Sequence, residues 1–108
     1  MTPEDRVLTV FERVRRSDPS VSDLYAVDAT LRSRNELHEG RPAIARFYEE
    51  RFRTSPVHPH VDDLFVSLPV IVALLSVTMS NGDVRRFADV FEVDGEAIRS
   101  LRVCPLVS

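Results

Sequence analysis

The sequence predicts an α+β fold in which three N-terminal helices pack against one face of an antiparallel sheet of about four to six strands. Two observations support this prediction. Before Pro56, apolar residues recur at the spacing of amphipathic helices. After Pro56, β-rich runs alternate with tight-turn signals, which is typical of an antiparallel meander. A chain of 108 residues can bury one hydrophobic core, so residues 1–108 are expected to form a single domain.

The first helix is expected over roughly residues 3–16. Thr2 can cap it with its hydroxyl, Pro3 suits the first helical position, and acidic residues follow in the first turn. One apolar stripe then recurs at helical spacing, made of Val7, Leu8, Val10, Phe11 and Val14.

Two further helices are expected before the sheet. The second, shorter one starts at Asp18-Pro19, and its Val21, Leu24 and Tyr25 fall at positions i, i+3 and i+4. The third starts at Pro42 and stops before Pro56. Its apolar side consists of Ile44, Phe47, Tyr48 and Phe52, and the intervening segments predict a short strand over residues 29–33 and a loop over residues 34–40.

Four β-rich runs follow, over residues 60–68, 70–80, 84–93 and 97–107. In the third run, a period of two places Asp89 on the same face as Phe87, Phe91 and Val93. A carboxyl group is therefore expected on the most apolar face of the sheet.

The run over residues 70–80 predicts that both faces of the sheet are covered. It is apolar at every position from Val70 to Leu75, whereas a one-sided antiparallel strand should alternate. The helices can cover one face, so we expect a homodimer through the outer sheet face. The alternative is a central strand buried by the curl of the sheet and by its loops.

Composition excludes several classes of partner and site. A net charge of −3 and a pI of about 5.6 give no reason to expect nucleic-acid binding. All 14 basic residues are arginine, so no lysine can form a Schiff base. The single Cys104 cannot form an internal disulfide and reads as a small buried hydrophobe. With no signal-like N-terminus and no long apolar run, a soluble, cytoplasmic protein without a membrane partner is expected.

Three motifs give the chain a family resemblance: "YAVDAT" at residues 25–30, "GRPAIARFY" at 40–48 and "ADVFEVDG" at 88–95. Together they resemble the nuclear transport factor 2-like superfamily, in the branch of the SnoaL-like polyketide cyclases and ketosteroid isomerase. The resemblance implies a cone-shaped fold, in which a strongly curved sheet wraps around helices. It also implies a ligand pocket in the mouth of the cone and dimers through the outer sheet face.

The resemblance also implies roles for individual residues. Asp89 falls where ketosteroid isomerases place the acid that donates a hydrogen bond to the developing oxyanion. Tyr25 and Tyr48 match two tyrosines that support that oxyanion site in some of those enzymes.

Two positions depart from the isomerase pattern. Ser33 replaces the usual general base, and the first helix offers Val10 or Phe11 in place of the principal oxyanion tyrosine. Ketosteroid isomerisation itself is therefore not expected. The limonene epoxide hydrolase relay is not expected either, because the corresponding strands, 70–80 and 98–105, contain no acidic residue.

Asp89 leaves three interpretations open. Burial beside phenylalanines would raise its pKa and make it a usable proton donor or base near neutrality. Alternatively, it pairs with Arg102 or Arg99 and stays ionised, or it is a mark of the fold whose chemistry has been lost.

An apolar pocket with few polar points is expected around this acid, suited to a small hydrophobic molecule with a carbonyl or hydroxyl group. Its ligand-binding residues are predicted to be Tyr25, Ser33, Asn35, Tyr48, Leu74, Ser76, Phe91, Leu101 and Val103. No cofactor is expected. No metal is expected either, because His38, His58 and His60 lack companion ligands at suitable spacing.

These observations predict a cofactor-free enzyme of the isomerase, cyclase or lyase type, which transfers a proton on an apolar carbonyl compound. The rival hypothesis is a non-catalytic module of the same fold that binds a ligand or mainly dimerises. Ser33 at the usual base position favours the rival, whereas the carboxyl of Asp89 favours the enzyme.

Overall fold

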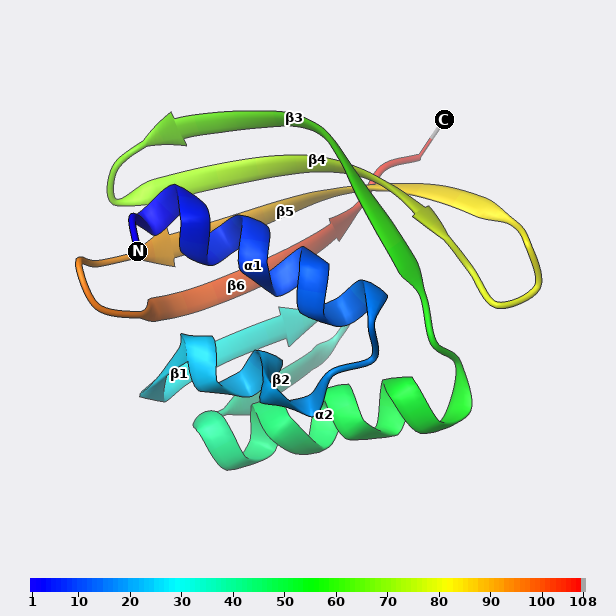
Figure 1. Ribbon diagram of the computed structural model, residues 1–108, viewed down its shortest axis with the longest axis horizontal. Helices are drawn as coiled ribbons and strands as arrows, with labels where there is room; N and C mark the ends of the chain where they lie inside the picture. The colour runs from blue at the N-terminus through cyan, green and yellow to red at the C-terminus, as the bar shows by residue number, and fades with distance from the viewer. Residues whose placement is uncertain (108) are drawn as a thin grey trace.

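The computed structural model describes residues 1–107, which form two α-helices, one 3-10 helix and a six-stranded sheet (Figure 1). The elements in chain order are α1 (Pro3–Arg15), η1 (Pro19–Leu24), β1 (Tyr25–Ser33), β2 (Glu36–Glu39), α2 (Arg41–Thr54), β3 (His58–Ser67), β4 (Val70–Thr78), β5 (Val84–Val93) and β6 (Ile98–Pro105). The predicted α+β class is confirmed.

The sheet is mixed, not wholly antiparallel as the sequence predicts. Its strand order is β2-β1-β6-β5-β4-β3. All neighbours run antiparallel except β1 and β6, which pair in parallel through Thr30 with Ser100 and Ser33 with Val103. The parallel direction is possible because β1 and β6 are far apart in the chain, so no hairpin turn forces them to run antiparallel.

The expectation of three N-terminal helices is wrong in detail. Thr2 caps α1 as predicted, with a reciprocal capping box to Asp5. The second helix is a short 3-10 turn that ends at Leu24, and α2 lies between β2 and β3. Tyr25 therefore opens a strand. Its spacing from Val21 also fits a helix. In the strand, Tyr25 and Ala29 are buried and Val27 is exposed, because the register of β1 shifts between Tyr25 and Thr30 and interrupts the regular alternation.

Residues 36–39, expected in a loop, form β2 against β1. A tight turn joins the two strands, with Arg34 in the left-handed region at φ 57°. Neither glycine nor proline marks this turn, which is why the sequence does not predict it. The four strands after Pro56 do follow the prediction, within about two or three residues at each end.

The helices lie on the inner side of the curved sheet. Figure 1 shows α1 crossing in front of the strands and α2 running along the end occupied by β1 and β2. The inward stripe of α1 meets the inward residues of β4 and β5, and each fully buried aliphatic side chain contributes about 1.5–3 kcal/mol. The core between them includes Val7, Val10, Phe11, Ile44, Ile71, Ala73, Leu75, Phe91 and Val93.

Both faces of β4 carry apolar side chains, but they are not equally covered. Ile71, Ala73 and Leu75 are buried under the helices, whereas Val72 and Leu74 on the outer face are only half-buried. Phe65, which pairs with Val72 across β3 and β4, is 56% exposed. The outer face is therefore apolar and open in a single chain.

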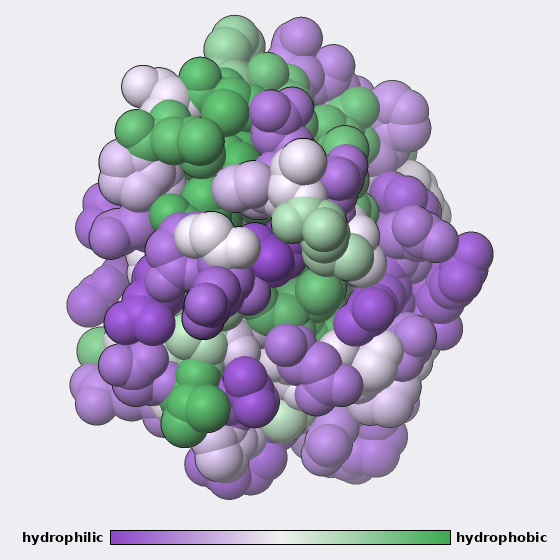
Figure 2. Space-filling view, turned by 60° about the vertical axis from the view of Figure 1, so that its left-hand side comes forward, coloured by the Kyte–Doolittle hydropathy of each residue, from purple (hydrophilic) through white to green (hydrophobic). Residues whose placement is uncertain are grey.

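Other exposed hydrophobic side chains, among them Val66 and Leu68, gather where β3 turns into β4. Figure 2 shows hydrophobic atoms in the upper part of this end of the molecule, interrupted by polar residues. Neither helix within residues 1–107 is long and apolar enough to cross a membrane.

Candidate active site

Asp89 lies at the middle of β5 and points toward the helices. Ala73 of β4 and Val103 of β6 flank it in register, so its nearest cross-strand neighbours carry no charge. It is 6% exposed, and its Oδ1 has no hydrogen-bond partner among residues 1–107. Burial raises the pKa of Asp89 to about 7, because desolvation disfavours the carboxylate.

The arginine pairing that the sequence left open does not form. Arg102 pairs in register with Val90, on the outer face of the sheet. Arg99 instead contacts Asp28 and Asp94, at 3.6 Å and 3.7 Å. Because no guanidinium reaches Asp89 within the described chain, its carboxyl group keeps the raised pKa.

A cavity of about 120 Å³ opens beside Asp89, bordered by both α-helices and by β1, β3, β4, β5 and β6. Its inner wall is apolar, with Val10, Phe11 and Val14 contributed by α1. Phe47 and Tyr48 come from α2, and the other apolar residues are Val57, Pro59, Leu75, Val77, Met79, Phe87, Leu101, Val103 and Pro105. The acid therefore has open space next to it in surroundings that suit an apolar guest.

Tyr25 and Tyr48 form a hydrogen-bonded pair with 2.7 Å between their hydroxyl oxygens. If Tyr48 donated, the proton of the fully buried Tyr25 would have no acceptor among the described residues, so Tyr25 donates. The O–H of Tyr48 is then free to donate into the cavity, which Tyr48 lines. Burial raises the pKa of both tyrosines and the charge of Asp89 raises it further, so both stay protonated.

The other predicted ligand-binding residues divide into three groups. Ser33, Leu101 and Val103 line the cavity beside Tyr48. Phe91 faces inward but packs edge-on against Phe11, 5.7 Å between ring centroids, outside the cavity wall. Tyr25 does not line the cavity either, but its hydroxyl contacts that of Tyr48, which does.

The placement of Leu74 and Ser76 in the pocket wall is wrong. The register pairs Ala73 with Asp89, so odd-numbered residues of β4 point inward, and Leu74 and Ser76 lie on the outer face. Leu75 and Val77 line the cavity in their stead. Asn35 is exposed in the turn between β1 and β2.

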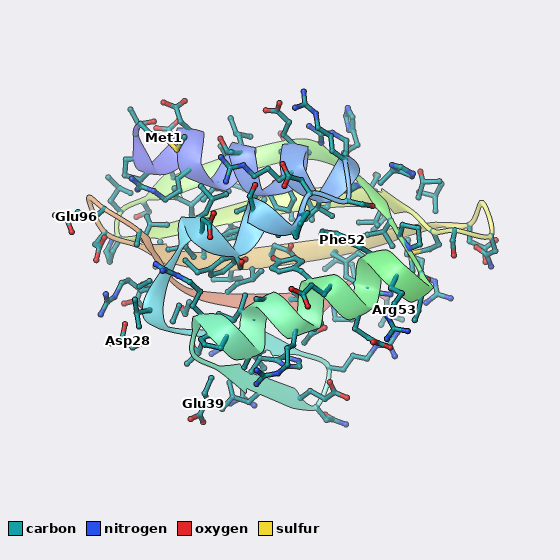
Figure 3. All side chains as sticks on the ribbon, turned by 60° about the horizontal axis from the view of Figure 1, so that its bottom comes forward. Met1, Asp28, Glu39, Phe52, Arg53 and Glu96 are labelled. Atoms are coloured by element: carbon teal, nitrogen blue, oxygen red, sulfur yellow. The ribbon has the colours of Figure 1, made fainter. Side chains whose placement is uncertain are left out.

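Among the cavity residues that sequence reasoning missed, three are charged: Arg34, Arg51 and Arg85. Two of them had a signal: Arg85 shares the strand parity of Asp89, and Arg51 follows Tyr48 by three residues on α2. Figure 3 shows the alternation on this helix, where Phe52 lies toward the sheet and Arg53 lies outside. Phe52 stacks on Tyr48, whereas Arg53 pairs with Glu50 in solvent.

The histidines and the cysteine lie away from the cavity. His38 packs against Phe47, with 4.8 Å between ring centroids, and His60 contacts Asp62 at 3.0 Å. Within residues 1–107, no three His, Cys, Asp or Glu side chains gather as metal ligands do. Cys104 pairs with Ala88 on the outer face and is half-buried.

Comparison with known proteins gives matches in structure but not in sequence. No protein-family model matches the chain, and neither does any curated protein. An NTF2-like protein of unknown function from Cytophaga hutchinsonii superposes with a TM-score of 0.84 at 17% identity, covering 98% of this chain and 91% of that one.

Two further solved structures are similar. A putative polyketide cyclase from Sinorhizobium meliloti has a TM-score of 0.84 at 19% identity and covers 92% of this chain and 93% of its own. A hypothetical protein from Catenulispora acidiphila with a ketosteroid isomerase-like fold, in complex with trimethylamine, has a TM-score of 0.84 at 17% identity. That alignment covers 95% of this chain and 85% of the other. The chain therefore has the fold of the nuclear transport factor 2-like superfamily, as its motifs predict.

Proposed function

We propose that the protein is a cofactor-free enzyme of the isomerase, cyclase or lyase type, which moves a proton on a carbonyl-containing, apolar small molecule. The observation that carries the proposal is Asp89: a buried carboxyl group whose Oδ1 has no partner within residues 1–107, which borders a cavity and has a pKa of about 7. At such a pKa, acid and base forms are both populated near neutrality, which suits a group that must take a proton and return it.

The proposed step uses Asp89 and Tyr48. The carboxylate of Asp89 takes a proton from the carbon next to the carbonyl, so the C–H bond breaks and its electron pair moves to the carbonyl oxygen. Tyr48 donates a hydrogen bond to the resulting enolate oxygen, with Tyr25 fixing the direction of the Tyr48 hydroxyl. The protonated Asp89 then returns the proton to another atom of the same molecule.

This assignment also accounts for Ser33. A serine hydroxyl is too weak a base to take such a proton, so Asp89 must act as both base and acid. The structural similarity to a putative polyketide cyclase supports the choice of reaction class, since that chemistry also uses carbonyl compounds.

Hydrogen–deuterium exchange tests the proposal. A panel of small cyclic ketones in D₂O, followed by proton NMR, should lose signal at the carbons next to the carbonyl faster with protein than without it. Asp89→Asn should abolish the protein-dependent rate, and Tyr48→Phe should lower it roughly 10²-fold. Unchanged exchange in Asp89→Asn would remove Asp89 from the mechanism, and binding without exchange in the wild type would support the non-catalytic module.

We also propose a homodimer through the outer sheet face. Phe65, Val72 and Val90 form an apolar row across β3, β4 and β5, and Arg102 and Asp63 provide charges of both signs around it. A face with both charges can complement a second copy related by a two-fold axis. The cytoplasmic location stays a prediction.

A further inference from the structure

The mouth of the Asp89 cavity is positively charged, unlike its inner wall. Arg34 follows β1, Arg51 lies on α2 and Arg85 lies on β5, and all three line the cavity. Asp89 is the one acidic residue among the lining residues described. Three chain segments therefore bring cations to one opening.

No internal acid neutralises these cations. Within residues 1–107 the side chains of Arg34, Arg51 and Arg85 form no ion pair or hydrogen bond, whereas Arg16 and Arg99 each pair with carboxylates. Arg51 is half-buried, and both this burial and the charge of Arg34 lower its pKa. Arg34 and Arg85 are exposed and Arg51 is half-buried, so the three like charges repel one another at the rim of the cavity, and an anion between them would relieve this repulsion.

The strand register places the arginines toward one end of the cavity and Asp89 toward the other. Ser33, Val103 and Asp89 form one row across β1, β6 and β5. Arg34 lies one residue beyond this row, at the end of β1. Arg85 precedes Asp89 by four residues on β5, about 13 Å along the strand. Arg51 follows Tyr48 by three residues on α2, about 4.5 Å along the helix axis. The cavity thus has a charged opening and an acid further inside.

We infer that the ligand of this cavity is a small amphipathic carboxylate, held by Arg34, Arg51 and Arg85 at the mouth, with its apolar body directed toward Asp89 and Tyr48. Arginine matches a carboxylate because its planar fork can donate two parallel hydrogen bonds. The cavity volume of about 120 Å³ limits the body to the size of roughly one ring, since a cavity of roughly 150 Å³ holds benzene. The inference rests on the proposed function only in placing the reacting carbonyl at Asp89.

A matched pair of ligands tests the charge requirement. 4-Acetylbenzoate and 4-acetylbenzamide share a ring and a ketone, but only the first is an anion. Ligand-observed NMR titration should give at least about tenfold tighter binding of the benzoate, and the difference should shrink as salt is added. Equal affinity for the two compounds would overturn the inference.

Variants of the arginines locate the effect. Arg51→Gln and Arg34→Gln should each reduce the preference for the benzoate severalfold, and the triple variant with Arg85→Gln should abolish it. Arg53→Gln is the matched control, because Arg53 lies on the same helix but is outside the cavity and pairs with Glu50. A preference that survives in the triple variant, with its thermal unfolding midpoint unchanged, would also overturn the inference.

A failure of the anion site can be distinguished from a failure of the proposed enzyme. Asp89→Asn should retain the preference for the benzoate, since Asp89 takes no part in holding the anion. A wild-type protein that prefers the benzoate but exchanges no ketone protons would retain the anion site and refute the enzyme. Exchange on neutral ketones without any preference for the benzoate would support the enzyme and refute the anion site.

Discussion

The hydroxyl oxygens of Tyr25 and Tyr48 lie 2.7 Å apart in the interior and join the first residue of β1 to the middle of α2. Tyr25 is fully buried and does not line the cavity, so its hydroxyl has no water as an alternative partner. This bond orients the one hydroxyl that reaches the cavity from α2, and at the same time contributes to the stability of the fold.

The losses of stability on removing the two tyrosine hydroxyls should not be additive. Tyr25→Phe leaves the buried oxygen of Tyr48 without its donor, and we expect a loss of about 1–3 kcal/mol in the free energy of unfolding. The double variant Tyr25→Phe/Tyr48→Phe should lose less than the sum of the two single losses. Urea denaturation of the four proteins gives the coupling energy, and simple additivity would show that the bond is not formed.

The raised pKa of Asp89 should make stability fall as the pH rises. Its pKa is about 7 in the folded protein and 3.8 in the unfolded chain, so the folded state binds more protons between these values. The contribution of Asp89 is therefore fully favourable below about pH 4, declines through the window to about pH 7, and is constant above it. The upper bound on the total change is about 4 kcal/mol.

The comparison with Asp89→Asn isolates this effect. Several exposed carboxyl groups have lowered pKa values and act with the opposite sign, namely Asp5, Asp18, Asp62 and Asp94. Subtracting the urea unfolding curves of Asp89→Asn from those of the wild type across this pH range removes their contribution. A difference that does not vary with pH would mean that Asp89 titrates normally in the folded state.

The proposed dimer should depend on the outer face of β4. Val72→Asp places a charge at the centre of the apolar row, where a partner would have to bury it, and should convert the dimer to a monomer. Leu8→Asp is the control, since Leu8 is 41% exposed on α1, which covers the opposite face of the sheet. Light scattering after size-exclusion chromatography measures the mass, and a monomeric wild type would refute the proposal.

Sequence patterns predicted the direction of Asp89 but not its neighbours. The period of two alone placed it beside Phe87 and Phe91, because a strand alternates whatever its partners are. Whether Arg102 or Val103 faces Asp89 depends on the register of β5 and β6, which shifts between Glu92 and Val93. Such a shift has no mark in the sequence.

The errors have similar causes. Because Val70 to Leu75 is apolar throughout, no polar residue shows which face of β4 is inward, and Leu74 was assigned to the wrong one. The arginine cluster was missed for a different reason, although Arg51 and Arg85 each had a signal in the sequence. Arg34, Arg51 and Arg85 come from three distant segments, and only the tertiary fold brings them to one opening.

The parallel pairing of β1 with β6 has a consequence for how the protein is made. Because β1 has only β2 and β6 as neighbours in the sheet, Ser33 and Arg34 cannot take their places until residues 98–105 have left the ribosome. Contacts between such distant segments form late and slowly. The binding residues of β1 and β6 therefore stay apart in the folding chain until these two strands pair, and the cavity is complete only after that step.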